Sequence, residues 1–212
     1  MKIFYLDTSS NFLYTAILED EVVIAEDKEK LEKDLSKYTL PKIKELILKN
    51  NISFDDIEKI IVVNGPGSFT GIRIGLTIAK TLAWAKNIPI IQISSLEAMA
   101  LSNNMENIDY IVPIIDARRG FVFSTIYDNN KKEFILKEQY INLTTLDAAL
   151  DSIVGNILFI TNDDIKTKYI RTIYEPNISK IVKITKNRQT INPHDVDANY
   201  LKLTEAEEKY DN

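Results

Sequence analysis

The feature that most constrains the fold of this chain is a pattern that occurs twice, in which an apolar stretch ends in an aspartate. Asp7 ends the first apolar stretch, and the next one, Phe12–Ile17, begins five residues later. Asp116 ends another, and Phe121–Ile126 again begins five residues later. Two unrelated β-hairpins could match by coincidence, but the shared spacing and residue classes favour an internal duplication. We therefore expect two related lobes, each opening with a strand, an aspartate, a turn and another strand.

Two lobes with this opening resemble the actin-like, sugar-kinase and Hsp70 group of proteins, in which the two turns face each other across a cleft and hold nucleotide phosphates. The resemblance implies an α/β fold of duplicated actin-like (ASKHA, ribonuclease-H-like) lobes, with mixed sheets flanked by helices. A length of 212 residues is compatible with two small lobes. We place an N-terminal lobe at residues 1–105 and a smaller, divergent C-terminal lobe at residues 106–212.

The spacing of apolar residues predicts the individual elements. Strands are expected at residues 2–8, 12–18, 21–25, 60–63, 88–93, 110–115, 121–127, 134–141 and 156–160. Helices are expected between Ser36 and Asn50, at 69–85, from residue 94 and at 144–151. The charged run at 26–34 is interpreted as a solvated connection. Beyond residue 161 the pattern weakens and indicates no clear element before 200–210.

Composition excludes several classes of function. A net charge of −5 argues against nucleic-acid binding by this chain alone, because such binding depends on basic side chains that neutralise phosphates. The absence of cysteine excludes disulfides and thiolate metal sites. The single histidine, His194, follows a proline in a polar stretch and is predicted to lie at the surface. A zinc or iron site would need mostly carboxylates, so we expect neither a metal nor a cofactor.

The N-terminal stretch and the rest of the chain lack the signals of export or membrane insertion. Asp7 interrupts the first apolar run too early for a signal peptide. No stretch reaches the roughly 18 uncharged apolar residues that a membrane span needs. We therefore expect a cytoplasmic protein that does not associate with a membrane.

Four of the six glycines fall within one short segment, at Gly65, Gly67, Gly71 and Gly75, between an expected strand and an expected helix. A glycine-rich turn before a helix could bind an anion through free backbone amides. The spacing, however, matches neither a phosphate-binding loop nor a dinucleotide fingerprint. An anion site is therefore not supported by the spacing.

A second pattern in this segment suggests an interface. Gly71, Gly75, Ala79 and Ala83 recur every four residues and form one stripe on the helix. Glycine inside a helix costs about 1 kcal/mol relative to alanine, so two of them need a structural reason. The stripe would allow close approach of another backbone, either the chain's own sheet or a partner, and the sequence leaves both open. The residues expected to bind a partner are Gly71, Ile72, Arg73, Gly75, Leu76, Ala79 and Ala83. The helix near Leu40 to Leu48 is expected to join this interface, so that each subunit contributes two helices.

The two aspartate turns are poor in glycine. The turn at residues 7–11 contains none, and the turn at 116–120 contains Gly120 alone. Actin-like proteins that bind ATP use glycine-rich turns, so this nucleotide site is predicted to be degenerate, with Asp7 and Asp116 shaping their own turns. The alternative is an actin-like ATP-binding enzyme, an ATPase or small-molecule kinase, that uses Asp7 and Asp116. A peptidase is disfavoured because there is one histidine and no nucleophile elbow.

Several of these segments resemble the TsaB (YeaZ) family, the dimerisation subunit of the bacterial machinery that adds threonylcarbamoyl to adenosine 37 of tRNA. The resemblance rests on residues 6–9, 65–75, 94–98 and 116–120, and on 199–202 at the C-terminal end. Its most specific part is the run Gly65-Pro66-Gly67-Ser68-Phe69-Thr70-Gly71. Thr81 and Leu35 depart from residues that are usual in the family.

The resemblance implies a non-catalytic scaffold subunit rather than an enzyme. It further implies a homodimer when the subunit is alone and a heterodimer with the catalytic paralogue TsaD. A P-loop ATPase, TsaE, would join the larger complex, and tRNA would be contacted only indirectly.

Overall fold

The computed structural model describes residues 1–31 and 34–202, which form two compact units. The first unit comprises Met1–Ala98 and Pro176–Asn199, and the second comprises Met99–Glu175 together with residues 200–202. Most of the pattern expected at 200–210 lies outside the described residues. No helix in the described part of the chain is long and apolar enough to cross a membrane.

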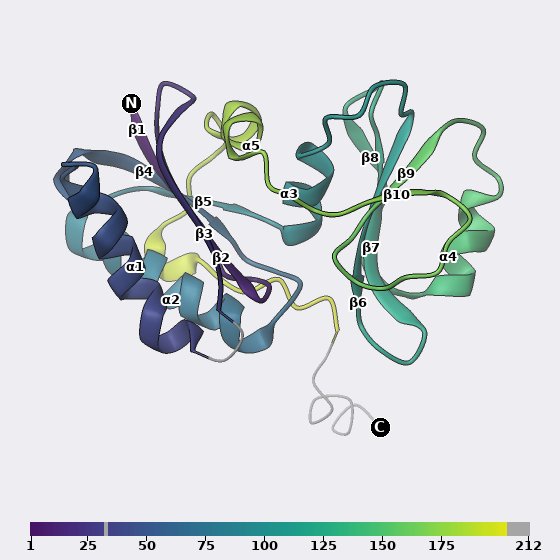
Figure 1. Cartoon of the computed structure of the whole chain (residues 1–212), viewed down its shortest axis with the longest axis horizontal. Helices are drawn as coiled ribbons and strands as arrows, with labels where there is room; N and C mark the ends of the chain where they lie inside the picture. The colour runs from purple at the N-terminus through teal and green to yellow at the C-terminus, as the bar shows by residue number, and fades with distance from the viewer. Residues whose placement is uncertain (32–33, 203–212) are drawn as a thin grey trace. The chain divides into compact units, whose positions relative to one another are not determined.

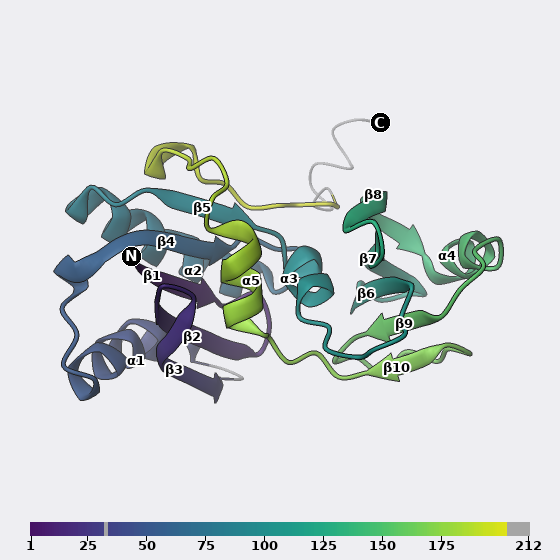
Figure 2. The same ribbon diagram turned by 90° about the horizontal axis from the view of Figure 1, so that it is seen from above.

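The first unit is built on a mixed sheet with the strand order β3-β2-β1-β4-β5. Its antiparallel part consists of β1 (Lys2–Asp7), β2 (Phe12–Glu19) and β3 (Val22–Lys30). β4 (Ile57–Val63) and β5 (Ile90–Ile93) continue the sheet in parallel to β1. A short 3-10 turn, Phe54–Asp56, precedes β4. In Figures 1 and 2, two long helices lie against one face of this sheet and a shorter one lies on the other side.

The two long helices are α1 (Leu35–Lys49) and α2 (Phe69–Lys86), close to their predicted positions. Alternate residues of β1 and β2 face them, because neighbouring side chains of a strand point to opposite sides of the sheet. The resulting core contains Phe4, Leu6, Leu13, Ile17, Ile43, Leu46, Ile60, Val62, Ile72, Leu76, Ala79 and Ala83. The helices are therefore held to the sheet by a continuous apolar core.

One prediction for this unit was wrong. Residues 26–30, interpreted from their charges as a solvated connection, form the second half of β3. β3 is the outer strand of the sheet, and its residues alternate between exposed and half-buried positions. An outer strand exposes one edge and much of its surface to water, so charged side chains are compatible with it.

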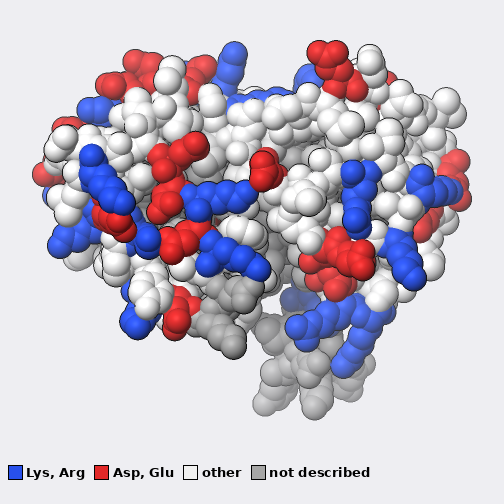
Figure 3. Space-filling view, in the orientation of Figure 1, with Lys and Arg blue, Asp and Glu red and all other residues white. Residues whose placement is uncertain are grey.

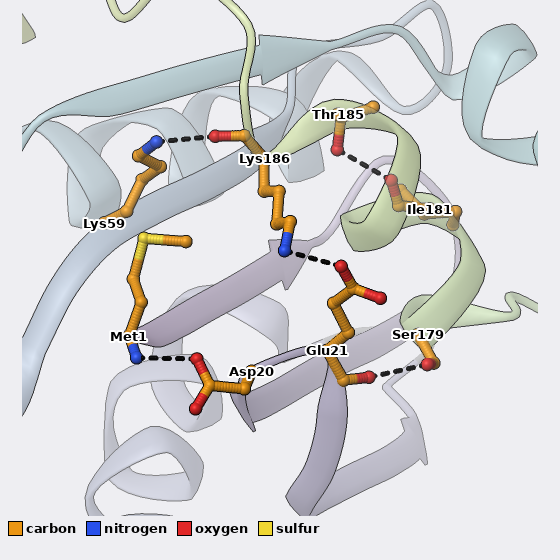
Figure 4. A network of polar contacts seen from close by, with 8 residues as sticks. All are labelled: Met1, Asp20, Glu21, Lys59, Ser179, Ile181, Thr185 and Lys186. Carbon is orange, nitrogen blue, oxygen red and sulfur yellow. Dashed lines mark hydrogen bonds and ion pairs between the residues drawn. The ribbon is translucent and has the colours of Figure 1, made fainter.

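The chain returns to the first unit at Pro176–Asn199, although the sequence suggested a single boundary near residue 105. This return segment contains α5 (Ile178–Thr185) and a 3-10 turn, Pro193–Asp195. The hydroxyl of Ser179 donates to the carbonyl oxygen of Glu21 at 2.6 Å, and the Lys186 ammonium pairs with the Glu21 carboxylate at 2.5 Å (Figure 4). Both contacts fasten α5 to the turn between β2 and β3.

The rest of the return segment, residues 188–199, runs along β5 as a strap (Figure 2). The Ile191 amide donates to the Ile90 carbonyl at 2.7 Å, and the Gln92 side-chain amide donates to the Asp197 carbonyl at 2.6 Å. The Lys80 ammonium on α2 donates to the carbonyls of His194, at 3.3 Å, and Val196, at 2.9 Å. The strap thereby covers the outer edge of the sheet and is tied to α2.

The second unit repeats the topology of the first. Its sheet has the order β10-β9-β6-β7-β8, and β9 is parallel to β6 as β4 is parallel to β1. The strands are β6 (Tyr110–Asp116), β7 (Phe121–Asp128), β8 (Glu133–Asn142), β9 (Ile157–Ile160) and β10 (Ile170–Thr172). The helix α4 (Leu143–Leu150) precedes β9 as α1 precedes β4, and α3 (Ser95–Leu101) leads from the first unit into the second. The predicted α/β fold of duplicated lobes is confirmed.

Candidate partner-binding surface

The start of α2 is fitted tightly onto the turn that follows β1. The Ser68 amide donates to the Ser9 carbonyl at 2.7 Å, and the Thr8 hydroxyl donates to the Gly71 carbonyl at 2.7 Å. A Cβ atom added at Gly71 would lie 2.0 Å from the Thr8 carbonyl oxygen, and one added at Gly75 would lie 2.2 Å from Thr8 Oγ1. These glycines are therefore required for the close approach of α2 to the chain's own turn.

This contact decides which side of α2 can meet a partner. Of the seven residues predicted to bind one, the structure buries Gly71, Ile72, Gly75, Leu76, Ala79 and Ala83 on the inner side of α2. Arg73 is the one member of this set that is exposed. A partner could reach the other six only by displacing the chain's own packing. The surface available for binding is the opposite side of α2.

Three backbone amides around the start of α2 are already bonded within the chain. Besides the Ser68 amide, the Gly71 amide donates to Ser68 Oγ at 3.2 Å, and the Ile72 amide donates to the Ser68 carbonyl at 2.8 Å. An anion site at a helix start depends on amides that have no partner within the protein. The glycine cluster thus serves packing in this chain.

Asp7 closes its own turn, as predicted. Its side chain is 2% exposed, and Oδ1 accepts hydrogen bonds from the Ser9 amide at 2.8 Å and the Ser9 hydroxyl at 2.7 Å. Burial raises the pKa of the Asp7 carboxyl group above its ordinary value, while the hydrogen bonds from Ser9 act in the opposite direction.

Asp116, its counterpart in the second unit, is exposed and also closes its turn. Its Oδ1 accepts from the Arg118 amide at 2.9 Å, and its own amide donates to the Asp163 carboxylate at 2.7 Å. His194 is exposed, as predicted. Within the residues that the structure describes, no three His, Asp or Glu side chains are grouped so that they could share a metal ion.

The outward sides of α1 and α2 expose large apolar side chains. Leu40 is 52% exposed and Leu48 is 63% exposed on α1, and Trp84 is 68% exposed on α2. α1 and α2 contact each other, so their outward sides form one surface. We call a set of ten exposed positions on this surface the outward rows. The outward rows consist of Lys37, Leu40, Pro41, Lys44 and Leu48 on α1, and Thr70, Arg73, Thr77, Thr81 and Trp84 on α2.

Half-buried apolar residues lie beside the outward rows. These half-buried residues include Ile47 on α1 and Ile74, Ile78 and Leu82 on α2. At the start of α2, the Arg73 guanidinium lies 3.9 Å from the centre of the half-exposed Phe69 ring. An apolar surface bordered by polar residues on two packed helices is typical of a protein–protein interface.

From the sequence we expected the helix near Leu40 to Leu48 to join the interface, without distinguishing which of its side chains face outward. Trp84 was not among the candidate contacts. On a helical projection Leu40 and Leu48 lie away from Ile43 and Leu46, which α1 buries. That difference in phase could have identified them as outward-facing apolar residues.

Comparison with known proteins places this arrangement in a family. Residues 23–154 match the family model described as TsaD: tRNA N6-adenosine threonylcarbamoyltransferase. The tRNA threonylcarbamoyladenosine biosynthesis protein TsaB of Bacillus subtilis (strain 168) is 35% identical over an alignment of 225 residues, which covers 99% of this chain and 98% of that protein. This chain belongs to the TsaB (YeaZ) family. TsaB of Escherichia coli (strain K12) is 32% identical over 132 residues, covering 62% of this chain and 57% of that protein.

This chain is also similar in sequence to a transferase of the kind for which the family model is named. The tRNA N6-adenosine threonylcarbamoyltransferase of Clostridioides difficile (strain 630) is 37% identical over 73 residues, which are 34% of this chain and 22% of that protein. Among solved structures, YeaZ from Pseudomonas aeruginosa has a TM-score of 0.75 at 16% identity, covering 93% of this chain and 100% of that one. At that identity the likeness establishes the fold.

Proposed function

We propose that this protein is a non-catalytic subunit that binds and supports the catalytic paralogue TsaD in the threonylcarbamoylation of adenosine 37 of tRNA. The observation that carries the proposal is the match to a TsaB protein over nearly the whole length of both chains. That relative is named for its part in tRNA threonylcarbamoyladenosine biosynthesis.

The geometry of the two aspartate turns supports a role without chemistry. Asp7 is buried and bonded to Ser9, and the amides of Ser68, Gly71 and Ile72 are bonded within the chain. Asp116 bonds the amide of its own turn. The groups that would hold phosphates in an actin-like enzyme are therefore used to keep the local structure in shape.

The exposed apolar surface on α1 and α2 supports a role in binding a protein. Its residues fall within the stretch that matches the TsaD family model, so a TsaD chain is expected to carry a related pair of helices. Two related chains can then meet through equivalent faces, as two identical chains do around a twofold axis. We propose that the outward rows form this contact with TsaD, and that two copies of this chain meet through the same rows in the absence of TsaD.

The wider assembly follows from the same family membership. In the proposal, the P-loop ATPase TsaE joins the heterodimer, tRNA is held mainly by the other subunits, and the complex works in the cytoplasm. The net charge of −5 is consistent with a subunit that does not bind tRNA by itself.

Reconstitution of the modification reaction tests the proposed function. TsaD and TsaE from the same organism are incubated with tRNA, ATP and an activated threonylcarbamoyl donor such as threonylcarbamoyl-adenylate, with and without this protein, and modified adenosine is measured by mass spectrometry. Modification is expected only when this protein is present. Equal modification without it would contradict a supporting role.

A titration with ATP separates the proposal from the alternative of an actin-like ATP-binding enzyme. The isolated protein is expected to bind ATP with millimolar affinity or not at all, as measured by calorimetry. Micromolar affinity, lost on substitution of Asp7 or Asp116, would support the enzyme instead.

A further inference from the structure

We infer that the outer edge of β10, in the second unit, is a docking site for an extended apolar segment of another protein that carries a basic residue at its N-terminal end. All the residues concerned belong to the second unit, and none lies on α1 or α2. The inference therefore does not depend on the proposed function.

The two units differ at one equivalent edge of their sheets. β5 and β10 hold the same place in the two strand orders. The strap runs along the edge of β5, where the Ile191 amide donates to the Ile90 carbonyl at 2.7 Å. Among the described residues, no segment pairs with the outer edge of β10 (Figure 2). The first unit thus shows how an extended segment covers an edge that the second unit leaves uncovered.

The side chains at the two edges differ in the same way. β5 buries its three isoleucines. On β10, Ile170 is exposed, and Ile173, directly after the strand, is 72% exposed. Figure 3 shows a mostly uncharged surface over the part of the second unit where Figure 1 places β9 and β10. An uncovered strand flanked by apolar side chains is suited to the addition of a further strand.

The backbone of β10 offers hydrogen-bonding groups on this uncovered side. The Thr172 carbonyl accepts from the Thr161 amide at 3.1 Å, so the backbone groups of Thr172 point toward β9. Successive residues of a strand direct these groups to opposite sides, and those of Arg171 therefore point to the outer edge. The Arg171 side chain is engaged separately, by the Asp164 carboxylate at 3.6 Å and the Ile165 carbonyl at 3.2 Å.

A pocket of about 400 Å³ lies at the carboxyl end of β10 and could hold one side chain of an added segment. Its apolar lining combines Met105 and Ile173, which are exposed, with Ile160 and Tyr174, which are buried. The remaining lining residues are Ser102, Asn103, Asn104, Thr172 and Glu175. The pocket thus extends the uncovered edge with an apolar cavity.

Charge specifies the occupant further. Glu175 is the one charged residue in the pocket lining, and Glu106, next to Met105 in the chain, is also exposed. The other charged residues of the segment 162–175 do not line the pocket; they are Asp163, Asp164, Lys166, Lys168 and Arg171. A basic residue at this end of the added segment would complement Glu175. Because the strap is antiparallel to β5, the N-terminal end of an equivalent segment would lie at the pocket.

The inference is tested with the full-length protein and a synthetic peptide, acetyl-Lys-Val-Thr-Val-Thr-Val-Thr, that carries a fluorescent label at its C-terminal end. Fluorescence anisotropy measures the dissociation constant. Two matched peptides serve as controls, one with N-methyl groups on alternate amides and one with glutamate in place of lysine. The N-methylated peptide should bind at least about tenfold more weakly, because it cannot pair with the strand. The glutamate peptide should also bind more weakly, and its difference should shrink in 500 mM NaCl. Absence of binding by the unmodified peptide up to about 1 mM would overturn the inference.

Two protein variants test the edge itself. Arg171→Pro removes the amide that points outward, whereas Arg171→Ala removes the same side-chain contacts and keeps the amide. Arg171→Pro should weaken binding of the peptide at least about tenfold relative to Arg171→Ala. If circular dichroism shows that the proline variant is unfolded, Ile173→Asp replaces it and should weaken binding by a similar factor. Equal affinities for these variants and the wild type would overturn the inference.

Hydrogen exchange locates the bound peptide. The peptide should slow amide exchange at residues 170–174 and leave exchange in α1 and α2 unchanged. β3 and β8 are the other outer strands that could accept a peptide. Slowed exchange at either of them, without an effect at β10, would overturn the inference.

Discussion

The hydroxyl of Thr8 donates a hydrogen bond to the backbone carbonyl of Gly71 at 2.7 Å, and this contact fixes which side of α2 faces the sheet. The bond joins the turn after β1 to the first part of α2, where glycine is needed for the two backbones to approach. Because Gly71 and Gly75 lie in this contact, the side of α2 that carries them faces the protein interior. The residues of the outward rows therefore lie at the surface.

Substitution of the glycines is expected to lower stability through this contact. In an unobstructed helix Gly→Ala stabilises by about 1 kcal/mol. At Gly75 the new Cβ would meet Thr8 Oγ1, so we expect Gly75→Ala to lower the free energy of unfolding by about 1–3 kcal/mol, as measured with urea.

A second substitution distinguishes a side-chain clash from a backbone clash. Thr8→Ala removes the hydroxyl that meets the Cβ at Gly75, so it should recover part of the stability lost in Gly75→Ala. It should not rescue Gly71→Ala, because there the Cβ meets the Thr8 carbonyl oxygen, which the substitution keeps. A stabilised Gly75→Ala protein would show that α2 lies farther from the turn than described.

The buried carboxyl group of Asp7 predicts a pH dependence of stability. Because its folded-state pKa is raised, the folded protein holds a proton on Asp7 over a pH range in which the unfolded chain has released it. The contribution of Asp7 to the free energy of unfolding therefore decreases as the pH rises through this range. At neutral pH the buried charge is a cost.

Asp7→Asn should remove this cost, because the amide oxygen can still accept both hydrogen bonds from Ser9. We expect the variant to be at least as stable as wild type at pH 7, with its advantage shrinking as the pH falls toward about 4. Urea unfolding across this pH range measures the difference. A variant that folds normally but abolishes tRNA modification in the reconstituted reaction would instead assign Asp7 a direct part in the chemistry.

Lys80 is expected to hold the strap at residues 188–199. Its ammonium is bonded to the carbonyls of His194 and Val196, so Lys80→Met leaves both carbonyls without this donor. We expect the free energy of unfolding to fall by about 1 kcal/mol and proteolytic cleavage within the strap to become faster. Lys137→Met, at an exposed position in the second unit, serves as the control. Unchanged cleavage would show that the strap is held by its other contacts alone.

The elements with a strong local signal could be predicted from the sequence. The expected helix at 69–85 and the observed α2, Phe69–Lys86, nearly coincide, because Ser68 caps the helix and apolar residues recur at helical spacing. The duplicated strand–aspartate–turn pattern likewise predicted two related lobes, and each aspartate does end the first strand of an antiparallel pair. That the two sheets share one strand order is shown by the structure.

Features that depend on distant contacts could not be predicted. The strap is held by single hydrogen bonds, such as Lys80 to Val196, which leave no periodic pattern in the sequence. The orientation of α2 was also ambiguous, because apolar residues occupy nearly all of its sides. Thr8 and Gly71 are far apart in the sequence and come into contact only in the folded chain. Their hydrogen bond resolves that ambiguity.

The measurement that tests the central claim most directly is complex formation between TsaD and a variant with Leu40→Asp and Leu48→Asp. Both residues are exposed, so the variant should fold like the wild type by circular dichroism. The matched control is Val154→Asp, which places the same change at a side chain that is 95% exposed in the second unit. Size-exclusion chromatography with light scattering should show a TsaD heterodimer for the wild type and for the control, and separate subunits for the Leu40→Asp, Leu48→Asp variant. A heterodimer of undiminished affinity with that variant would contradict the assignment of partner binding to the outward rows of α1 and α2.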